Sequence, residues 1–309
     1  MSRFIKDLLV YAFFGAVFYI TALIITGYYL PRSFNKNLSY HLGGYGHLYT
    51  RLKEVKIYKD VDVLILGSSH AYRGFDTRLF RKNGIKVFNL GSSAQTPLQT
   101  EILVKRYIKK LNPKLVIYEV YPGSFCSDGI ESAVDLISND NIGIDIFIMT
   151  LKLHNIKVFN TFIFSLFNQI FNLNKDFTES AIKDKDCYVK GGYVEKELVS
   201  QINIKDYKAS KWKFIPDQYE IFKKILFFFK QNNINYILVQ APYTHELYNS
   251  HYNNDEIDRN FDKLGNYYNF NNLLVLPTEK YFYDSNHLNQ DGVTIFNQKL
   301  IPLVKTYLR

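Results

Sequence analysis

The stretch Val63-Leu64-Ile65-Leu66-Gly67-Ser68-Ser69-His70 decides the fold, because an apolar run stops at a glycine and is followed by two hydroxyls and an imidazole. A run this apolar is typical of a strand buried on both faces, as in parallel sheets covered by helices. In open sheets of this kind, ligands bind beyond the carboxyl ends of the strands. The pattern predicts a strand that ends at Leu66 and a candidate nucleophile at Ser69. A strand-Gly-Ser turn is more often a plain loop or a helix N-cap than an active site, so it does not define a site alone.

Further apolar runs continue this pattern along the chain. With the first run they predict five buried strands, at residues 61–66, 86–89, 115–120, 236–240 and 273–276. Helix-compatible stretches at 76–82 and 97–111 separate the first three strands, and another at 217–231 precedes the fourth. Alternating strands and helices predict an α/β domain, a flavodoxin-like three-layer α/β/α fold with a five-stranded parallel sheet.

Residues 8–30 form an uncharged apolar stretch, long enough to cross about 30 Å of hydrocarbon as a helix. The stretch is too long for a cleavable signal peptide and lacks a small-residue cleavage site. We therefore predict an N-terminal transmembrane helix that acts as an uncleaved anchor within residues 1–31, with Tyr28 and Tyr29 at the interface. Basic residues flank both of its ends, so their distribution does not fix the orientation.

The remaining boundaries follow from composition. Residues 32–60 are polar and rich in Gly, Tyr and Lys, so we predict a connector in which His41 and His47 are solvated. Residues 61–309 form the α/β/α domain, interrupted by a large, mainly helical insertion at 122–216 with helical patterns at 142–153 and 158–171. The aromatic residues of this insertion suit a cap over the site, a membrane-facing surface or packing within an inserted layer.

Charge and cysteine content exclude some functions. The 309 residues carry a formal net charge of +9, but the basic residues are mixed with acidic ones, and no nucleic-acid-binding motif accompanies them. Nucleic acid is therefore not an expected partner. Cys126 and Cys187 lack the spacing of a metal site, and we expect neither a metal nor another cofactor. The two cysteines are either free thiols or, outside the cytoplasm, a disulfide.

A second polar segment lies near the C-terminus and reads Tyr283-Asp284-Ser285-Asn286-His287. Asp284 and His287 are three residues apart in a loop that opens into an apolar helix-like run, so both side chains can converge on one crevice. A serine nucleophile needs a base, and the base needs an acceptor that fixes its tautomer. Ser69, His287 and Asp284 supply these three roles. Weaker candidates for substrate contact follow the first and fourth strands: His70, Gln240 and Tyr243.

Three blocks of this sequence resemble those of the SGNH (GDSL-like) hydrolases: Gly67-Ser68-Ser69-His70, Asn89-Leu90-Gly91 and Asp284-x-x-His287. The resemblance covers the chain from about residue 61 to the end, apart from the insertion. It implies that Ser69 is the nucleophile, with His287 and Asp284 as its proton relay. It also implies an oxyanion hole built from the backbone N–H groups of Ser69 and Gly91.

The chain departs from the family pattern in its third block. The family places an oxyanion-binding asparagine after the third strand, whereas this chain reads Glu119-Val-Tyr-Pro-Gly-Ser-Phe125, and Ser68 replaces an aspartate of the first block. Loss of one oxyanion donor costs on the order of a hundredfold or more in rate. A donor from the insertion or from residues 92–95, or the backbone near Gly123, would replace it. Otherwise the site has kept binding and lost catalysis.

The resemblance implies a membrane-anchored serine esterase or O-acyltransferase acting on acyl esters of cell-envelope glycans or related polymers. Water as the second substrate gives an esterase, and a sugar hydroxyl gives a transferase. Such substrates lie outside the cytoplasm, so we expect a single-pass protein of the cytoplasmic (inner) membrane with an extracytoplasmic domain. A membrane acyltransferase is the protein partner that this function allows. The alternative is a catalytically silent anchored module that binds envelope glycan or a partner membrane protein.

Overall fold

The computed structural model describes residues 2–197 and 206–309, so part of the predicted insertion at 122–216 lies outside the described residues. The chain divides into two compact units. The first comprises Met1–Leu42 and Ala133–Phe177, and the second comprises Gly43–Ser132 and Thr178–Arg309. The domain boundaries expected from the sequence stay predictions.

The second unit contains a five-stranded parallel sheet with the strand order β2-β1-β3-β7-β8. In the register of the sheet, Val63 lies opposite both Val87 and Leu115. Every residue of the first strand is buried, as its apolar run predicts. The strands are β1 (Val63–Leu66), β2 (Val87–Asn89), β3 (Leu115–Glu119), β7 (Asn235–Gln240) and β8 (Tyr267–Asn269).

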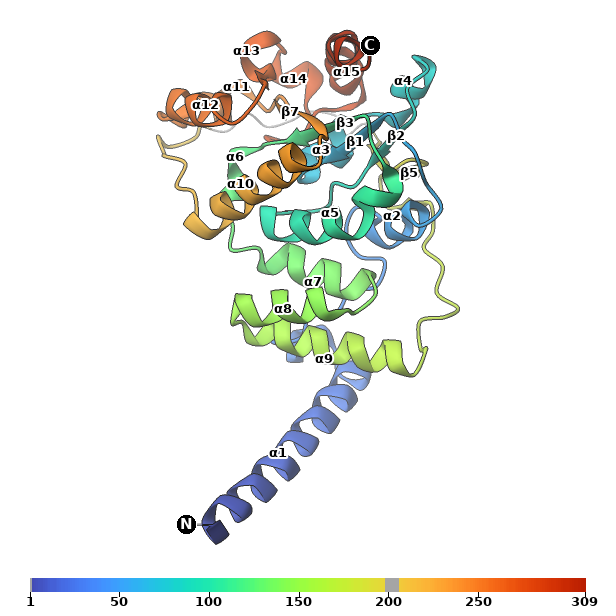
Figure 1. Ribbon diagram of the computed structural model, residues 1–309, viewed down its shortest axis with the longest axis vertical. Helices are drawn as coiled ribbons and strands as arrows, with labels where there is room; N and C mark the ends of the chain where they lie inside the picture. Colours follow the sequence, from blue (N-terminus) through green and yellow to red (C-terminus); the bar gives the residue numbers. More distant parts are fainter. Residues whose placement is uncertain (1, 198–205) are drawn as a thin grey trace. The chain divides into compact units, whose positions relative to one another are not determined.

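Helices cover both faces of this sheet (Figure 1). Val63 and Ile65 of β1 belong to a core cluster that includes Phe296 and Leu300 of α15 (Gln290–Tyr307). On the opposite face, Tyr118 of β3 packs edge-on against Phe222 of α10 (Pro216–Gln231), with ring centroids 5.1 Å apart. Helix α5 (Pro97–Leu111) packs beside α10. The predicted three-layer α/β fold with a parallel five-stranded sheet is confirmed.

The fifth strand was predicted at the wrong place. Residues 270–273 form α13 (Phe270–Leu273), and Val275 in the following loop is 96% exposed. The strand is Tyr267–Asn269, at the edge of the sheet. Its tyrosine hydroxyls are hydrogen-bonded, Tyr267 to Asp258 at 2.7 Å and Tyr268 to Tyr307 at 2.6 Å. An edge strand stabilised in this way does not produce an apolar run.

The predicted helices are present at or near their expected bounds. Helix α5 begins at Pro97 after a capping box formed by Thr96 and Gln99. Asp76 caps the preceding helix, α4 (Thr77–Lys82), by accepting a hydrogen bond from the Arg78 N–H. The other helices of the second unit are short: α2 (Leu48–Val55), α3 (Ser69–Gly74), α4 (Thr77–Lys82), α6 (Pro122–Phe125), α11 (His245–Asn249), α12 (Asn254–Asp262) and α14 (Thr278–Tyr281).

Two parts of the second unit were not predicted. Strands β4 (Ile182–Lys183), β5 (Asp186–Val189) and β6 (Tyr193–Lys196) form an antiparallel sheet within the insertion. Helix α2 lies in the predicted connector. His47, expected to be solvated, is fully buried, with Nδ1 3.6 Å from Oε1 of Glu179, because α2 and the segment before β4 fold over it.

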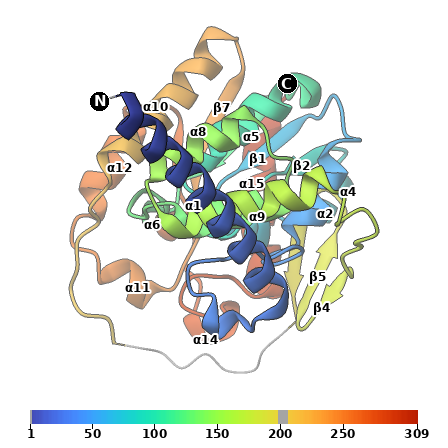
Figure 2. The ribbon, with the colours of Figure 1, turned by 90° about the horizontal axis from the view of Figure 1, so that it is seen from below.

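The first unit is helical. It contains α1 (Ser2–Tyr29), the 3-10 turn η1 (Arg32–Phe34), α8 (Ile144–Leu153) and α9 (Ile156–Ile170), together with most of α7 (Ile130–Asn139). Helix α1 passes over α9 (Figure 2), and a Cβ added at Gly27 would lie 2.4 Å from the Phe164 ring. Among the described residues, α1 is the one helix long and apolar enough to cross a membrane, and an 18-residue window within Arg3–Tyr29 has a mean hydropathy of 2.4. A signal anchor and a signal peptide both fit this helix.

Candidate active site

The turn after β1 places Ser69 at the carboxyl edge of the sheet. Gly67 adopts φ 139°, and a Cβ there would lie 2.8 Å from both the Cβ and the carbonyl oxygen of Glu119. Only glycine therefore lets the chain pass this close to the end of β3. Ser68 then caps α3, with its hydroxyl accepting from the His70 N–H, so that Ser69 becomes the first residue of the helix.

Ser69, His287 and Asp284 lie in hydrogen-bond contact. The distance from His287 Nε2 to Ser69 Oγ is 2.8 Å, and the distance from His287 Nδ1 to Asp284 Oδ2 is 2.9 Å. If Nδ1 donates its proton to the carboxylate, Nε2 is left to accept the proton of the Ser69 hydroxyl. The structure thus brings together side chains that lie 218 residues apart.

Backbone hydrogen bonds within the loop fix the position of the Asp284 carboxylate. Asp284 Oδ1 accepts hydrogen bonds from the N–H groups of Asn286 and His287 at 2.7 and 2.8 Å. Burial acts to raise the pKa of Asp284, but these hydrogen bonds and the charge of His287 hold it below its usual value. The Ser285 carbonyl accepts from the N–H and hydroxyl of Thr244, which joins the loop to the segment after β7. The carboxylate is therefore fixed in place and ionised.

Ser69 and His287 open into a cavity of about 470 Å³. None of its described lining residues is aliphatic. The lining comprises the segment Gly43, Gly44, Tyr45 and Gly46, then Ser69, Tyr72, Arg73, Ser93, Lys183, Asp184, Asp186, Lys196, Tyr283, Asp284 and His287. The cavity is therefore built for a polar ligand.

The small antiparallel sheet supplies one wall of this cavity. Arg73 of α3 donates two hydrogen bonds to the Asp186 carboxylate, at 3.0 and 2.8 Å, and Lys196 lies 3.1 Å from the same group. Lys183 pairs with Glu179. These residues were not predicted from the sequence, because isolated charged residues in an insertion resemble a solvated surface. A cation four residues after the candidate serine, Arg73, was the one available signal.

The weaker predicted contacts do not lie at the cavity wall. Gln240 is buried, and its amide is occupied by the hydroxyls of Tyr267 and Tyr243 at 2.6 and 3.2 Å. Tyr243 is buried as well and lines another cavity, of about 540 Å³. His70 is buried against Tyr121, with ring centroids 4.0 Å apart. The structure therefore gives His70, Gln240 and Tyr243 supporting positions behind the cavity of Ser69, among aromatic side chains, and their contact with a substrate stays a prediction.

A buried carboxyl lies behind the serine. Glu119, at the end of β3, accepts a hydrogen bond from the Ser68 hydroxyl at 3.3 Å, and that hydroxyl lies 3.3 Å from His70 Nδ1. Burial raises the pKa of Glu119 to about 8. Burial and the nearby His287 lower the pKa of His70 well below its usual value. Near neutral pH both groups are therefore mainly uncharged. The sequence analysis missed this buried pair, because it noted only that the block beginning at Glu119 lacks the asparagine of the family.

The expected second oxyanion donor is already engaged. The Gly91 N–H donates to Asn89 Oδ1 at 3.0 Å, and a Cβ at Gly91 would lie 2.7 Å from the Cβ of Ala71. Gly91 therefore serves close packing against α3, and the structure does not support its predicted role as a donor. In the following turn, Ser92 N–H donates to the Gly67 carbonyl at 3.3 Å, and Ser93 lines the cavity beside Ser69.

No protein-family model matches the sequence, and no curated protein matches it. A presumed acylhydrolase from Bacteroides fragilis matches the structure with a TM-score of 0.44 and 11% identity, over 85% of this chain and 98% of that chain. A GDSL-like lipase from Bacteroides thetaiotaomicron matches with a TM-score of 0.41 and 12% identity, over 84% of this chain and 97% of that chain. These are distant similarities to GDSL-like lipase and acylhydrolase structures.

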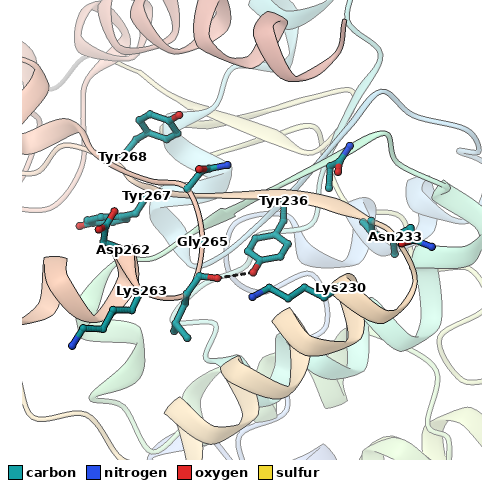
Figure 3. A pocket seen from close by; sticks show the side chains of 12 residues that line it. Lys230, Asn233, Tyr236, Asp262, Lys263, Gly265, Tyr267 and Tyr268 are labelled. Carbon is teal, nitrogen blue, oxygen red and sulfur yellow. Dashed lines mark hydrogen bonds between the residues drawn. The ribbon is translucent and has the colours of Figure 1, made fainter.

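Other features of the second unit do not form a comparable site. A cavity of about 660 Å³ lies at the amino-terminal ends of β7 and β8, the opposite edge of the sheet from Ser69 (Figure 3). Its described lining contains Lys230, Asp262 and Lys263 but no nucleophile with a base. Cys126 and Cys187 are free thiols. In the described part of the chain, no group of three or more His, Cys, Asp or Glu side chains is arranged to hold a metal ion.

Proposed function

We propose that this protein is a serine-dependent acyl-ester hydrolase or O-acyltransferase. The observation that carries the proposal is the continuous contact from Ser69 Oγ through His287 to the Asp284 carboxylate, at 2.8 and 2.9 Å. A nucleophile, a base and an acceptor that orients the base are the parts that acyl transfer requires. Their position beside an open cavity gives an ester access to the serine.

The reaction proceeds in two acyl transfers. Ser69 Oγ attacks the ester carbonyl carbon while His287 Nε2 takes the hydroxyl proton, and Asp284 stabilises the resulting imidazolium. The tetrahedral intermediate then breaks its bond to the alcohol oxygen, which leaves with the proton from His287. Water or a sugar hydroxyl next gives its proton to His287 and attacks the acyl-Ser69 carbonyl. Release of Ser69 yields a carboxylic acid in the first case and a new ester in the second.

Two donors are proposed for the oxyanion. The N–H of Ser69 stands at the first position of α3, where a helix amide has no acceptor within the helix. Ser93 lines the same cavity, in a turn held by the Ser92 N–H to Gly67 hydrogen bond and by the Ser92 hydroxyl to Gln95 hydrogen bond of 2.7 Å, and its hydroxyl is the second proposed donor. Ser93 takes the place that the resemblance gave to the N–H of Gly91 and the missing asparagine.

The cavity favours a short acyl group on a sugar-like substrate. Its described wall has no aliphatic side chain to receive a long acyl chain, whereas its tyrosines and hydrogen-bonding groups suit a polyhydroxylated ring. Several of its charges are paired with one another, as in the Arg73–Asp186 and Lys196–Asp186 contacts. We therefore propose an acylated glycan of the cell envelope as substrate. In this proposal α1 anchors the protein in the cytoplasmic membrane, with the α/β unit outside the cytoplasm and a membrane acyltransferase as a partner.

The engaged N–H of Gly91 favours a second candidate, a silent anchored module that binds glycan or a partner membrane protein. A fluorophosphonate probe separates the two in the detergent-solubilised full chain. We expect labelling of the unmodified protein and of Ser180→Ala, a control that removes an exposed serine of the same unit. We expect none with Ser69→Ala and strongly slowed labelling with His287→Ala. A folded protein that takes no label contradicts the enzyme and supports the binding module.

A further inference from the structure

Helix α8 exposes an apolar stripe. Its four residues lie at positions i, i+3, i+4 and i+7, so they share one face of the helix. Ile146 and Met149 on the other face are buried. The stripe is exposed by 73, 40, 47 and 43% at Ile144, Phe147, Ile148 and Leu151, respectively. This arrangement inverts the usual pattern of a surface helix, whose exposed face is polar, and the described part of the chain does not cover the stripe.

The stripe continues onto α9. The Phe147 ring lies 5.7 Å from the half-buried ring of Phe162, which joins the two helices into one apolar surface. At the two ends of α9, Ile156 and Ile170 are 53 and 63% exposed. Lys152 is exposed at the edge of the α8 stripe, where a long basic side chain can reach outward from an apolar surface. Contiguous apolar surfaces of this kind mark contacts with a partner or a membrane.

The attachment of α9 to α1 indicates that a lipid bilayer covers this apolar surface. Tyr19 and Tyr28 of α1 donate hydrogen bonds to Asn160 and Asn168 of α9, at 2.7 and 2.6 Å. The 28 residues of α1 extend about 42 Å, which exceeds the roughly 30 Å of bilayer hydrocarbon. The last turn of α1 therefore reaches the headgroup region, where Tyr28 holds Asn168 of α9, whereas Tyr19 holds Asn160 about two and a half turns deeper along α1. Figure 1 shows α8 and α9 lying across that end of α1.

We propose that the apolar face of α8, continued by α9, inserts into the headgroup boundary of the same phospholipid bilayer that α1 crosses. An interfacial helix buries its apolar side to a depth of about 5–10 Å and keeps basic residues at its edge, which matches the exposed stripe and Lys152. The inference rests on the proposed anchoring by α1 and is independent of the proposed acyl chemistry.

The test uses the full chain in vesicles of phosphatidylcholine and phosphatidylglycerol. An environment-sensitive fluorophore is attached to a single cysteine in a Cys126→Ser, Cys187→Ser background. The probe site is Ile148→Cys on the stripe. Phe18→Cys in α1 is the embedded reference, and Lys230→Cys on α10 is the matched exposed site of the other unit. Both Ile148 and Phe18 are exposed, so these substitutions leave the core intact.

We expect brominated lipid chains to quench the fluorophore at position 148, with the best quenching at a shallower bromine depth than at position 18. Aqueous iodide is expected to quench position 148 at least severalfold less than position 230. Equal iodide quenching at positions 148 and 230 overturns the proposal. Shielding of position 148 from both quenchers also overturns it, because a second copy or another protein then covers the stripe. Absence of lipid quenching at position 18 overturns the anchoring itself, whereas fluorophosphonate labelling of Ser69 is unaffected.

Discussion

Replacement of the buried carboxyl by Glu119→Gln is expected to change how the stability of the α/β unit depends on pH. Glu119 is 1% exposed, receives the Ser68 hydroxyl on Oε2, and has no hydrogen-bond partner in the described structure for Oε1. Burial raises its pKa to about 8, against 4.5 for an ordinary glutamate. Glutamine has the same shape and does not ionise, so the substitution removes the titration while retaining most of the packing.

The sign and magnitude follow from proton linkage. Between pH 4.5 and 8 the native state retains a proton that the unfolded chain has lost, so the free energy of unfolding falls as pH rises. The slope is about 1.4 kcal/mol per pH unit, which gives about 5 kcal/mol over the interval. Above pH 8 both states are ionised and the slope disappears. Relative to the unmodified protein, the free energy of unfolding of Glu119→Gln is therefore expected to rise by about 3 kcal/mol between pH 4.5 and 7.

Urea unfolding in detergent micelles measures this difference. Trp212 is the single tryptophan and is buried in the α/β unit, so its fluorescence reports unfolding there. The control is Glu101→Gln, which removes a partly exposed glutamate paired with Lys105 on α5 and is expected to keep the slope of the unmodified protein. We expect the free energy of unfolding of Glu119→Gln, relative to that of the unmodified protein, to change strongly between pH 5 and 8. A change of less than about 0.5 kcal/mol refutes the claim that Glu119 is protonated in the native state.

Further substitutions test the site and its support. Asp284→Asn is expected to lower kcat of ester hydrolysis by about 10³–10⁴-fold with little change in KM, because His287 loses the acceptor that fixes its tautomer. Ser93→Ala is expected to lower kcat by about 10²–10³-fold and Ser93→Thr to restore most of it, and equal rates for both variants contradict an oxyanion role. Asp186→Asn is expected to raise KM for an acetylated sugar more than it lowers kcat, since it releases Arg73 from the cavity wall, and an unchanged KM contradicts this placement. Gly67→Ala is expected to lower the melting temperature by several degrees, because a Cβ there meets Glu119 at 2.8 Å.

The sequence predicts those parts of the fold that rest on local patterns. The apolar run of β1 predicts a buried parallel strand, and the rule that ligands lie at the carboxyl ends of such strands leads to Ser69. The spacing of Asp284 and His287 predicts their convergence because the loop between them is short. Strand β8 was placed wrongly, since its tyrosines pack by hydrogen bonds to distant residues rather than by an apolar pattern.

The supporting features were missed for a related reason. The burial of His47 and Glu119 depends on contacts with segments far along the chain, which a single sequence does not display. Gln240 is the last residue of β7, a position that suits a substrate-binding residue, yet two tyrosine hydroxyls occupy its amide. Position at the end of a strand therefore predicts nearness to the site, whereas the direction of a side chain depends on its tertiary neighbours.

The cavity wall and the nucleophile share one anchor. Arg73 lies on α3, the helix that begins with Ser69, and its bidentate contact with Asp186 fastens that helix to the small antiparallel sheet. A second contact joins the neighbouring helix to the same sheet, because Arg78 of α4 pairs with Glu195 of β6 at 2.6 Å. The wall proposed to contact the substrate is thus attached beside the serine, while His287 and Asp284 are held separately by the loop before α15. In this arrangement, substitution of the other side chains of the inserted sheet is expected to change substrate preference, provided that Asp186 and Glu195 keep their arginine partners.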